Sequence, residues 1–250
     1  MNTDLSPHLP RVSGYSIQGR KPSQQDAWYA SPHTLNGRLV FVADGVGGHA
    51  HGEFASELCV EVYKKSFEKE PFIVDEKQYL YDTAMIVAER VYQKGQDDPA
   101  YNGCGTTLSG FMIAGGRFHL INIGDSRVYL SDREGNLTQM TKDHSVVQQL
   151  LDMGQITEEE ARTHPRRNVM FSAIGVNPEE ITITVGGPYE LEHGDILFAF
   201  SDGVPDAITD EQIREVILKN RQNPELCRMI VDAAYEAGGK DNITACCYRH

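Results

Sequence analysis

The middle of the chain is a run of short strand-like segments separated by turns, and no other feature limits the possible folds as much. Four segments rich in β-branched and aromatic residues follow one another here: Thr106–Ile113, Arg117–Ile123, Arg127–Ser131 and Leu137–Met140. Residues typical of hairpin turns separate them at Ala114-Gly115-Gly116 and at Asp132–Asn136. Because strands joined by tight turns pair in opposite directions, the sequence predicts antiparallel sheets.

Further strands and a pair of helices surround this region. The other strand-like segments are Val12–Gln18, Ala27–Ser31, Arg38–Ala43, Ile181–Val185, Ile196–Phe200 and Ile243–Tyr248. Apolar residues repeat with helical spacing in Glu53–Phe67 and again in Glu76–Gln93, where Asp75 is the expected N-cap.

Capping residues mark a second pair of helices near the end of the chain. Thr209 and Gln212 form an expected capping box, and Asn223-Pro224 places a proline at the first helical position of the next helix. Since strands outnumber helices and the helices come in pairs, we predict an α+β fold, a four-layer α-β-β-α sandwich of two mainly antiparallel sheets flanked by helix pairs. We expect a single domain over residues 1–250, with its core in residues 12–248.

Residues 142–172 differ from the rest of the chain because they are polar and irregular. Two short helical patches interrupt them, and Thr157-Glu158-Glu159-Glu160 is a capping box that opens the second patch. Long connections of this kind are often functional surface loops. We interpret the segment as a mobile flap.

The composition excludes several classes of protein. Asp and Glu number 36 against 23 Lys and Arg, a net charge of −13, whereas binding to nucleic acid requires a basic surface. No apolar run resembles a signal peptide or approaches the ~18–20 residues that span a bilayer. The five cysteines lack the spacing of a zinc site or a disulfide framework. We therefore expect a cytoplasmic protein, a monomer, with no nucleic-acid or membrane partner.

Aspartates recur at the ends of apolar segments. Asp44 and Asp202 each end a strongly apolar segment and are each followed by glycine, Asp125 follows a third such segment, and Asp241 stands just before the final strand. A single Asp-Gly pair is usually only a turn. Repetition at the ends of central strands instead indicates that these carboxylates meet at the rim of the core, where their repulsion is costly unless cations neutralise it.

Ligands of this kind favour particular metals and a particular chemistry. Oxygen donors without His or Cys at metal spacing select hard ions such as Mg²⁺ or Mn²⁺. Two such ions that share a carboxylate can activate a water molecule and hold a phosphoryl group. The residues alone therefore predict a two-metal hydrolase acting on phosphate esters.

A set of short motifs resembles a known family. In chain order they are Gln25-Asp26-Ala27, Asp44-Gly45-Val46-Gly47-Gly48-His49, Gly105-Thr106-Thr107, Gly124-Asp125-Ser126-Arg127, Asp143-His144-Ser145, Ser201-Asp202-Gly203 and Asp241-Asn242-Ile243-Thr244. In this order and spacing they resemble the metal-dependent PPM, or type 2C, serine/threonine protein phosphatases in their bacterial form. The resemblance extends from about Ser13 to Cys247.

The resemblance implies a set of metal ligands. Asp44 would bridge two ions, Mn²⁺ or Mg²⁺, and the carbonyl oxygen of Gly45 would bind one of them. Asp202 and Asp241 would complete the ligands of the other ion. Asp125 matches a position that helps to hold a third, weaker ion in bacterial members.

Other motif residues would support the site. The resemblance implies that Asp26 acts through a water molecule bound to a metal ion. Gly105-Thr106-Thr107 and Arg127 would support the sheet beneath the site. The flap of the family falls in residues 142–172, as the composition also indicates.

The sequence departs from the family where substrate phosphate binds. The family usually has an arginine five residues before the Asp26 position, whereas this chain has Lys21 there, with Arg20 beside it. In an extended strand only one of the two side chains would point into the site. We favour Arg20, brought in by a one-residue bulge before Pro22, because its planar guanidinium suits a phosphate dianion better than an ammonium group does.

The general acid is a second departure. Val46 stands where animal members have a histidine that has been proposed as the general acid. His49 is the candidate substitute, because its ordinary pKa suits proton transfer near neutral pH. An arginine often found shortly before Ala173-Ile174-Gly175 is replaced by Ser172.

These motifs predict an enzyme that removes phosphate from phosphoserine and phosphothreonine of proteins by means of a metal-activated water. Its partners would be phosphorylated proteins, including a partner serine/threonine kinase and the substrates of that kinase. Two alternatives stay open at this point. One is a catalytically weak, phosphoprotein-binding regulatory module of the same fold, which the missing arginines favour. The other is a phosphatase of small phosphorylated metabolites.

Overall fold

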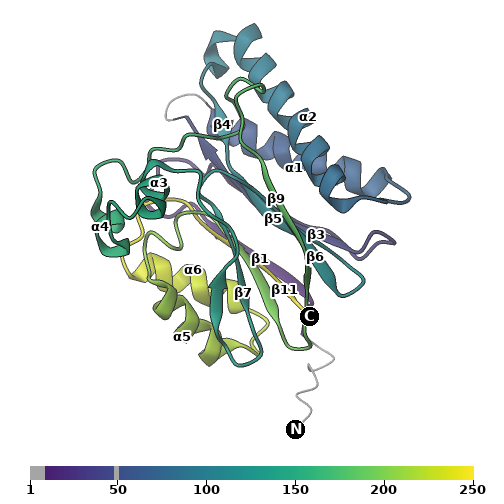
Figure 1. Ribbon diagram of the computed structural model, residues 1–250, viewed down its shortest axis with the longest axis vertical. Coiled ribbons are helices and arrows are strands. Elements are labelled where there is room, and N and C mark those ends of the chain that lie inside the picture. The colour runs from purple at the N-terminus through teal and green to yellow at the C-terminus, as the bar shows by residue number, and fades with distance from the viewer. Residues whose placement is uncertain (1–8, 48–50) are drawn as a thin grey trace.

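The structure, a computed structural model, describes residues 9–47 and 51–250 (Figure 1). His49, the candidate general acid, lies outside the described residues.

Two antiparallel sheets form the centre of the fold. One sheet has the strand order β1 (Val12–Ile17), β11 (Ile243–Arg249), β10 (Ile196–Phe200), β7 (Arg127–Ser131) and β8 (Leu137–Gln139). The other has the order β2 (Asp26–Ala30), β3 (Arg38–Val46), β5 (Leu108–Ala114), β6 (Arg117–Ile123) and β9 (Thr184–Glu190), and the short β4 (Gly105–Thr106) pairs with β3. The antiparallel pairing predicted from the turns is confirmed.

A pair of helices covers the outer face of each sheet, as Figure 1 shows. On the β3 sheet these are α1 (Gly52–Lys69) and α2 (Glu76–Asp97), followed by the 3₁₀ turn η1 (Pro99–Tyr101), and on the β10 sheet they are α5 (Asp210–Asn220) and α6 (Leu226–Glu236). No helix in the described ranges is both long and apolar enough to cross a membrane.

Three apolar layers hold these elements together, because successive strand side chains point to opposite faces. On β3, Phe41 packs under α1 and α2, whereas its neighbour Val42 points between the sheets. On β10, Leu197 shares that central layer, and Phe198 packs against α5 and α6. The predicted four-layer α-β-β-α sandwich is therefore confirmed.

The capping residues decide where several helices begin. Asp75 accepts a hydrogen bond from the backbone N–H of Gln78, and Thr209 forms the expected capping box with Gln212. The prediction for α6 is wrong by two residues, because this helix begins at Leu226 rather than at Pro224. The side chain of Asn223 accepts a hydrogen bond from the N–H of Glu225, so these residues form a turn that precedes the helix.

The last strand of the β3 sheet also begins later than the sequence indicated. We predicted Ile181–Val185, but β9 spans Thr184–Glu190 and includes Gly186, Gly187 and Pro188. Glycine and proline usually argue against a strand, but an edge strand tolerates them because one row of its backbone groups needs no partner.

The flap predicted in residues 142–172 contains two short helices, α3 (Val146–Asp152) and α4 (Glu158–Thr163). Thr157 caps α4, and its capping box with Glu160 is complete. The two helical patches read from the sequence are thus confirmed.

Candidate metal and phosphate site

The predicted carboxylates lie on strand ends that meet at one end of the sandwich. Asp26, at the start of β2, lies directly opposite Asp44, near the end of β3. In the other sheet Asp202 follows the end of β10, and Asp241 precedes the start of its antiparallel neighbour β11. The end of one strand lies beside the start of the next in such a pair, so each sheet contributes two carboxylates to this end.

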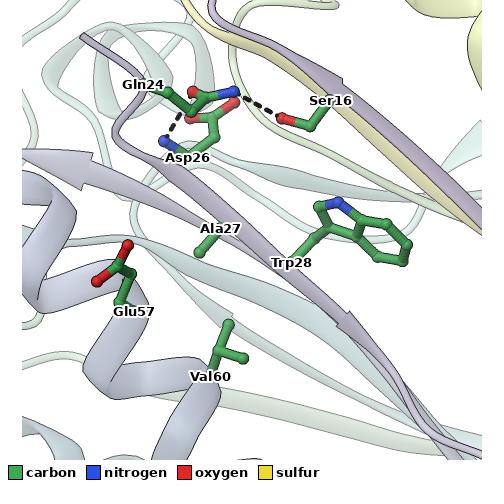
Figure 2. A pocket seen from close by; sticks show the side chains of 7 residues that line it. All are labelled: Ser16, Gln24, Asp26, Ala27, Trp28, Glu57 and Val60. Carbon is green, nitrogen blue, oxygen red and sulfur yellow. Dashed lines mark hydrogen bonds between the residues drawn. The ribbon is translucent and has the colours of Figure 1, made fainter.

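Asp26 connects the two sheets. Its Oδ2 atom accepts hydrogen bonds from the hydroxyl groups of Ser201, at 2.8 Å, and Thr244, at 2.6 Å. The Thr244 hydroxyl also pairs with that of Ser16, at 2.7 Å, and Gln24 donates its amide to Ser16, at 2.8 Å (Figure 2). The other oxygen of Asp26, Oδ1, is buried and has no hydrogen-bond partner among the described residues.

The sequence did not reveal this arrangement. Ser201 and Thr244 belong to the motifs that carry the family resemblance, but the resemblance implied no role for either residue. Their function follows from contacts between residues more than 170 positions apart, since 175 positions separate Ser201 from Asp26.

Thr106 and Thr107 hold the backbone of Asp44 in place. The N–H of Asp44 donates to Thr107 Oγ1 at 3.0 Å, and its carbonyl oxygen accepts from the N–H of Thr107 at 2.8 Å and from Thr106 Oγ1 at 3.0 Å. Gly45 has no room for a side chain, because a Cβ atom would lie 2.5 Å from the carbonyl oxygen of Gly52. These contacts explain why glycine and two threonines accompany Asp44.

Burial and mutual repulsion disfavour charge on the carboxylates of this group. Burial raises the pKa of Asp44 and of Asp202 well above the usual range, and the negative charges of their acidic neighbours raise both further. Burial also raises the pKa of Asp26, to about 6, although the hydrogen bonds from Thr244 and Ser201 act in the opposite direction. Without a compensating cation, ionising these groups together is therefore unfavourable.

The donor atoms fit a hard divalent cation in their chemistry. They are carboxylate oxygens and a backbone carbonyl, and Oδ1 of Asp202 is buried without a hydrogen-bond partner among the described residues. In residues 9–47 and 51–250, however, no group of three or more His, Cys, Asp or Glu side chains is arranged so that it could hold a metal ion. One of these carboxylates, Asp241, instead has an oxygen held by Lys21.

Asp125 lies beside the others, on the loop that follows β6. Burial raises its pKa to about 7, and the next largest contribution is the negative charge of Asp143. Asp143 itself forms a two-pronged ion pair with Arg127, with Arg127 Nη2 2.7 Å and Nε 2.9 Å from its carboxylate oxygens. Arg127 therefore pairs directly with the neighbour of Asp125, and its charge lowers the pKa of Asp125 as a smaller contribution.

Arg20 and Lys21 lie in different surroundings. The ammonium group of Lys21 is 2.8 Å from Oδ2 of Asp241, whereas the guanidinium of Arg20 lies over the ring of Tyr235 on α6, 5.1 Å from its centre. Burial lowers the pKa of Lys21, but the hydrogen bond and charge of Asp241 outweigh it, so the pKa is raised overall.

The expected bulge before Pro22 is not what places these side chains. β1 ends at Ile17, and Gly19 has a φ of 61°, in the left-handed region, so residues 18–25 form a loop with a turn and bends instead of an extended strand. Asn242 fixes this loop: its Oδ1 accepts from the N–H of Gln25 at 2.8 Å, and its Nδ2 donates to the carbonyl oxygens of Gln18 and Ser23. The alternation of strand side chains therefore does not apply to Arg20 and Lys21.

The four-layer sandwich with carboxylates at one end matches a known family. The chain belongs to the protein phosphatase 2C family, because the model of that family matches residues 13–230. The family resemblance found in the sequence is thereby confirmed.

Curated relatives and solved structures agree with this assignment. The serine/threonine protein phosphatase PstP of Mycobacterium tuberculosis is 36% identical over 225 residues, which are 90% of this chain and 41% of that protein. The serine/threonine phosphatase stp of Listeria monocytogenes is 32% identical over 212 residues, 84% of this chain and 83% of that protein. The crystal structure of the catalytic domain of PstP in complex with two manganese ions has a TM-score of 0.82 and 34% identity, and the match covers 95% of this chain and 96% of that chain. The chain thus spans less than half the length of the mycobacterial relative.

Proposed function

We propose that this chain is a metal-dependent protein phosphatase that hydrolyses phosphoserine and phosphothreonine of protein substrates. The observation that supports it most is the group of carboxylates at one end of the sandwich, in which burial and mutual repulsion raise the pKa values of Asp44, Asp26 and Asp202. Membership of the protein phosphatase 2C family and the names of the relatives support the same reaction.

We further propose the ligands of the metal ions. Asp44 would bridge two Mn²⁺ or Mg²⁺ ions, the carbonyl oxygen of Gly45 would bind one, and Asp202 and Asp241 would bind the other. Asp125 would help to hold a third ion. When bound, such ions convert a water molecule into a nucleophile and stabilise the charge of the phosphoryl group.

The residues around the ions would position the reactants. Ser201 and Thr244 hold one oxygen of Asp26, which leaves its Oδ1 free to accept a hydrogen bond from the attacking water. Lys21 lies at the carboxylates and would exchange its contact with Asp241 for the substrate phosphate. Arg20 would reach the phosphate only by leaving the ring of Tyr235.

The wider role follows from the same reaction. The partners would be phosphorylated proteins, among them a serine/threonine kinase and its substrates. We propose a single catalytic domain that acts as a cytoplasmic monomer. His49 is proposed as general acid on the sequence alone.

Hydrolysis of an aryl phosphate with and without metal tests the reaction. Activity should disappear with EDTA and return with Mn²⁺ or Mg²⁺, and Asp44→Ala should lose at least one bound ion and nearly all turnover. Asp152→Ala, on the exposed surface of α3, is a matched control that should behave as wild type. Full turnover in metal-free protein, or a tenth of the wild-type rate in Asp44→Ala, would contradict the proposal.

A comparison of substrates separates the competing functions. A phosphothreonine peptide should be a better substrate than small phosphorylated metabolites. Preference for the metabolites would favour a small-molecule phosphatase, and tight peptide binding without turnover would favour a regulatory module.

A further inference from the structure

The outer edge of β2 offers backbone groups that no strand occupies. β2 is the first strand of its sheet and pairs only with β3. The N–H of Gly45 donates to the carbonyl oxygen of Gln25, and the N–H of Ser31 donates to that of Leu39, so odd-numbered residues of this segment face β3. Because hydrogen-bonding direction alternates along an antiparallel strand, the N–H and C=O groups of Trp28 and Ala30 point away from the sheet.

These outward groups are unpaired within the described chain. In residues 9–47 and 51–250 no hydrogen bond reaches the backbone of Trp28 or Ala30 from outside the sheet. Asp26 differs, because its outward N–H is capped by the side-chain oxygen of Gln24 at 3.1 Å. The unpaired backbone groups of this edge therefore begin at Trp28, two residues after Asp26.

A pocket of about 380 Å³ lies along this edge (Figure 2). It is lined by residues of β1, the loop before β2, β2 itself and α1: Ser16, Gln24, Asp26, Ala27, Trp28, Glu57 and Val60. Asp26 belongs both to the pocket lining and to the carboxylate group, so the pocket and the proposed active site share this residue. Trp28 is held firmly, since a Cβ atom on Gly14 of β1 would lie 2.5 Å from its indole ring.

We propose that an extended segment of the phosphoprotein substrate binds as an added strand along β2, next to its phosphorylated residue. Unpaired N–H and C=O groups on a sheet edge pair with an extended chain whatever its sequence. This inference rests on the proposed function, because it is the phosphorylated residue that brings the segment to this edge.

The two sides of the edge give the docked segment a side-chain preference. Side chains of an added strand alternate between the two faces of the sheet. On one face they meet Ala27, Val60 and the exposed carboxylate of Glu57, which favours lysine or arginine. On the other face they meet Trp28, which favours an apolar residue.

Trp28 makes docking directly measurable, because it is the only tryptophan of the chain. In Asp44→Ala protein, which should lack turnover, a phosphothreonine peptide with several flanking residues should change the fluorescence of Trp28, and phosphothreonine alone should not. In wild type, methylating alternate backbone nitrogens on one side of the phosphothreonine should raise KM about tenfold with little change in kcat, because each methyl group removes a strand hydrogen bond. Equal KM values for every methylated peptide would overturn the inference.

A charge exchange provides a second test. Glu57→Lys should lower kcat/KM for a peptide with lysine at the preferred position and raise it for the matching glutamate peptide. Glu61→Lys, one turn further along α1 and outside the pocket, makes the same change of charge and should not alter this preference. An unchanged preference in Glu57→Lys would contradict the docking site. Failure of the wild type to hydrolyse an aryl phosphate with Mn²⁺ would instead contradict the proposed function, while the fluorescence of Trp28 would still report docking.

Discussion

Thr244→Val isolates the contribution of one hydroxyl group to the proposed site. Thr244 is fully buried, and its hydroxyl donates to Oδ2 of Asp26 at 2.6 Å. Valine has nearly the same shape, so the substitution removes the donor and little else. Ser201 still donates to the same oxygen at 2.8 Å, and Asp26 is therefore weakened in its position but not released.

The size of the effect follows from the charge on the acceptor. A hydrogen bond to a charged group contributes about 1.5–3 kcal/mol. If Asp26 acts in the transition state, this loss lowers kcat by about 10- to 150-fold, since about 1.4 kcal/mol corresponds to a factor of ten. KM for an aryl phosphate should hardly change, because Thr244 is fully buried and its hydroxyl contacts Asp26.

The dependence on pH gives a second readout. The hydrogen bond from Thr244 lowers the pKa of Asp26 by favouring its charged form, against the burial that raises this pKa to about 6. Its removal raises the pKa further, so the carboxylate is protonated up to a higher pH. The acid side of the profile of kcat against pH should therefore move to higher pH in Thr244→Val.

Two variants control for other causes. Thr244→Ser keeps the hydroxyl and should restore most of the rate. Ser16→Ala removes the partner of Thr244 at 2.7 Å without touching Asp26 and should have a smaller effect. The reasoning is refuted if folded Thr244→Val keeps kcat within threefold of wild type, or if Thr244→Ser is impaired as much as Thr244→Val.

Four further outcomes are expected. Asp125→Ala should leave the two tightest ions bound in a calorimetric titration but lower kcat sharply, and loss of the tightest ion would contradict its placement. Lys21→Ala should raise KM for a phosphopeptide more than Arg20→Ala does, because of these two residues only Lys21 contacts one of the carboxylates. If steady-state kinetics gave the reverse order, Arg20 would be the residue that binds the phosphate. Arg127→Met leaves the buried carboxylate of Asp143 without its ion-pair partner, with only a hydrogen bond from Gln139 at 3.3 Å. It should lower the free energy of unfolding in urea by about 3–5 kcal/mol, and a loss below about 1 kcal/mol would show the pair to be dispensable. Asp202→Asn should raise the Tm of the metal-free protein at neutral pH. Folding raises the pKa of the Asp202 carboxyl, and such a group destabilises the fold at any pH above its unfolded pKa. An unchanged Tm would argue against the burial and repulsion that raise this pKa.

Turn residues made much of the fold predictable. The bounds predicted for Arg117–Ile123, Arg127–Ser131 and Ile196–Phe200 are those of β6, β7 and β10, because glycine or polar residues limit each strand at both ends. Where glycine and proline lie inside an edge strand, as in β9, the same rule places the strand too early. Local signals thus determine a strand well when turn residues lie outside it and poorly when they lie within it.

The candidate site was predictable as a set of residues but not as a set of contacts. Asp44 and Asp202 could be found because each ends an apolar strand, a pattern visible within a few residues. The partners of Asp26 could not, since Thr244 lies 218 positions away and only the pairing of the two sheets brings it near. Lys21 and Arg20 illustrate the same limit, because the loop that carries them is shaped by Asn242 at the other end of the chain.

The electrostatics of the site explain why Asp26 has hydroxyl donors rather than a basic partner. Arg127 pairs with Asp143, and a further arginine next to Asp26 would stabilise its charge more strongly than two hydroxyl groups do. A permanent cation there would also repel divalent ions from Asp44. Hydroxyl groups fix the orientation of Asp26 without adding charge, so the carboxylate end keeps a negative potential that would attract the proposed metal ions. Lys21 is compatible with this arrangement because it lies on a loop, with nearly half of its side chain exposed, and can turn from Asp241 toward an incoming phosphate.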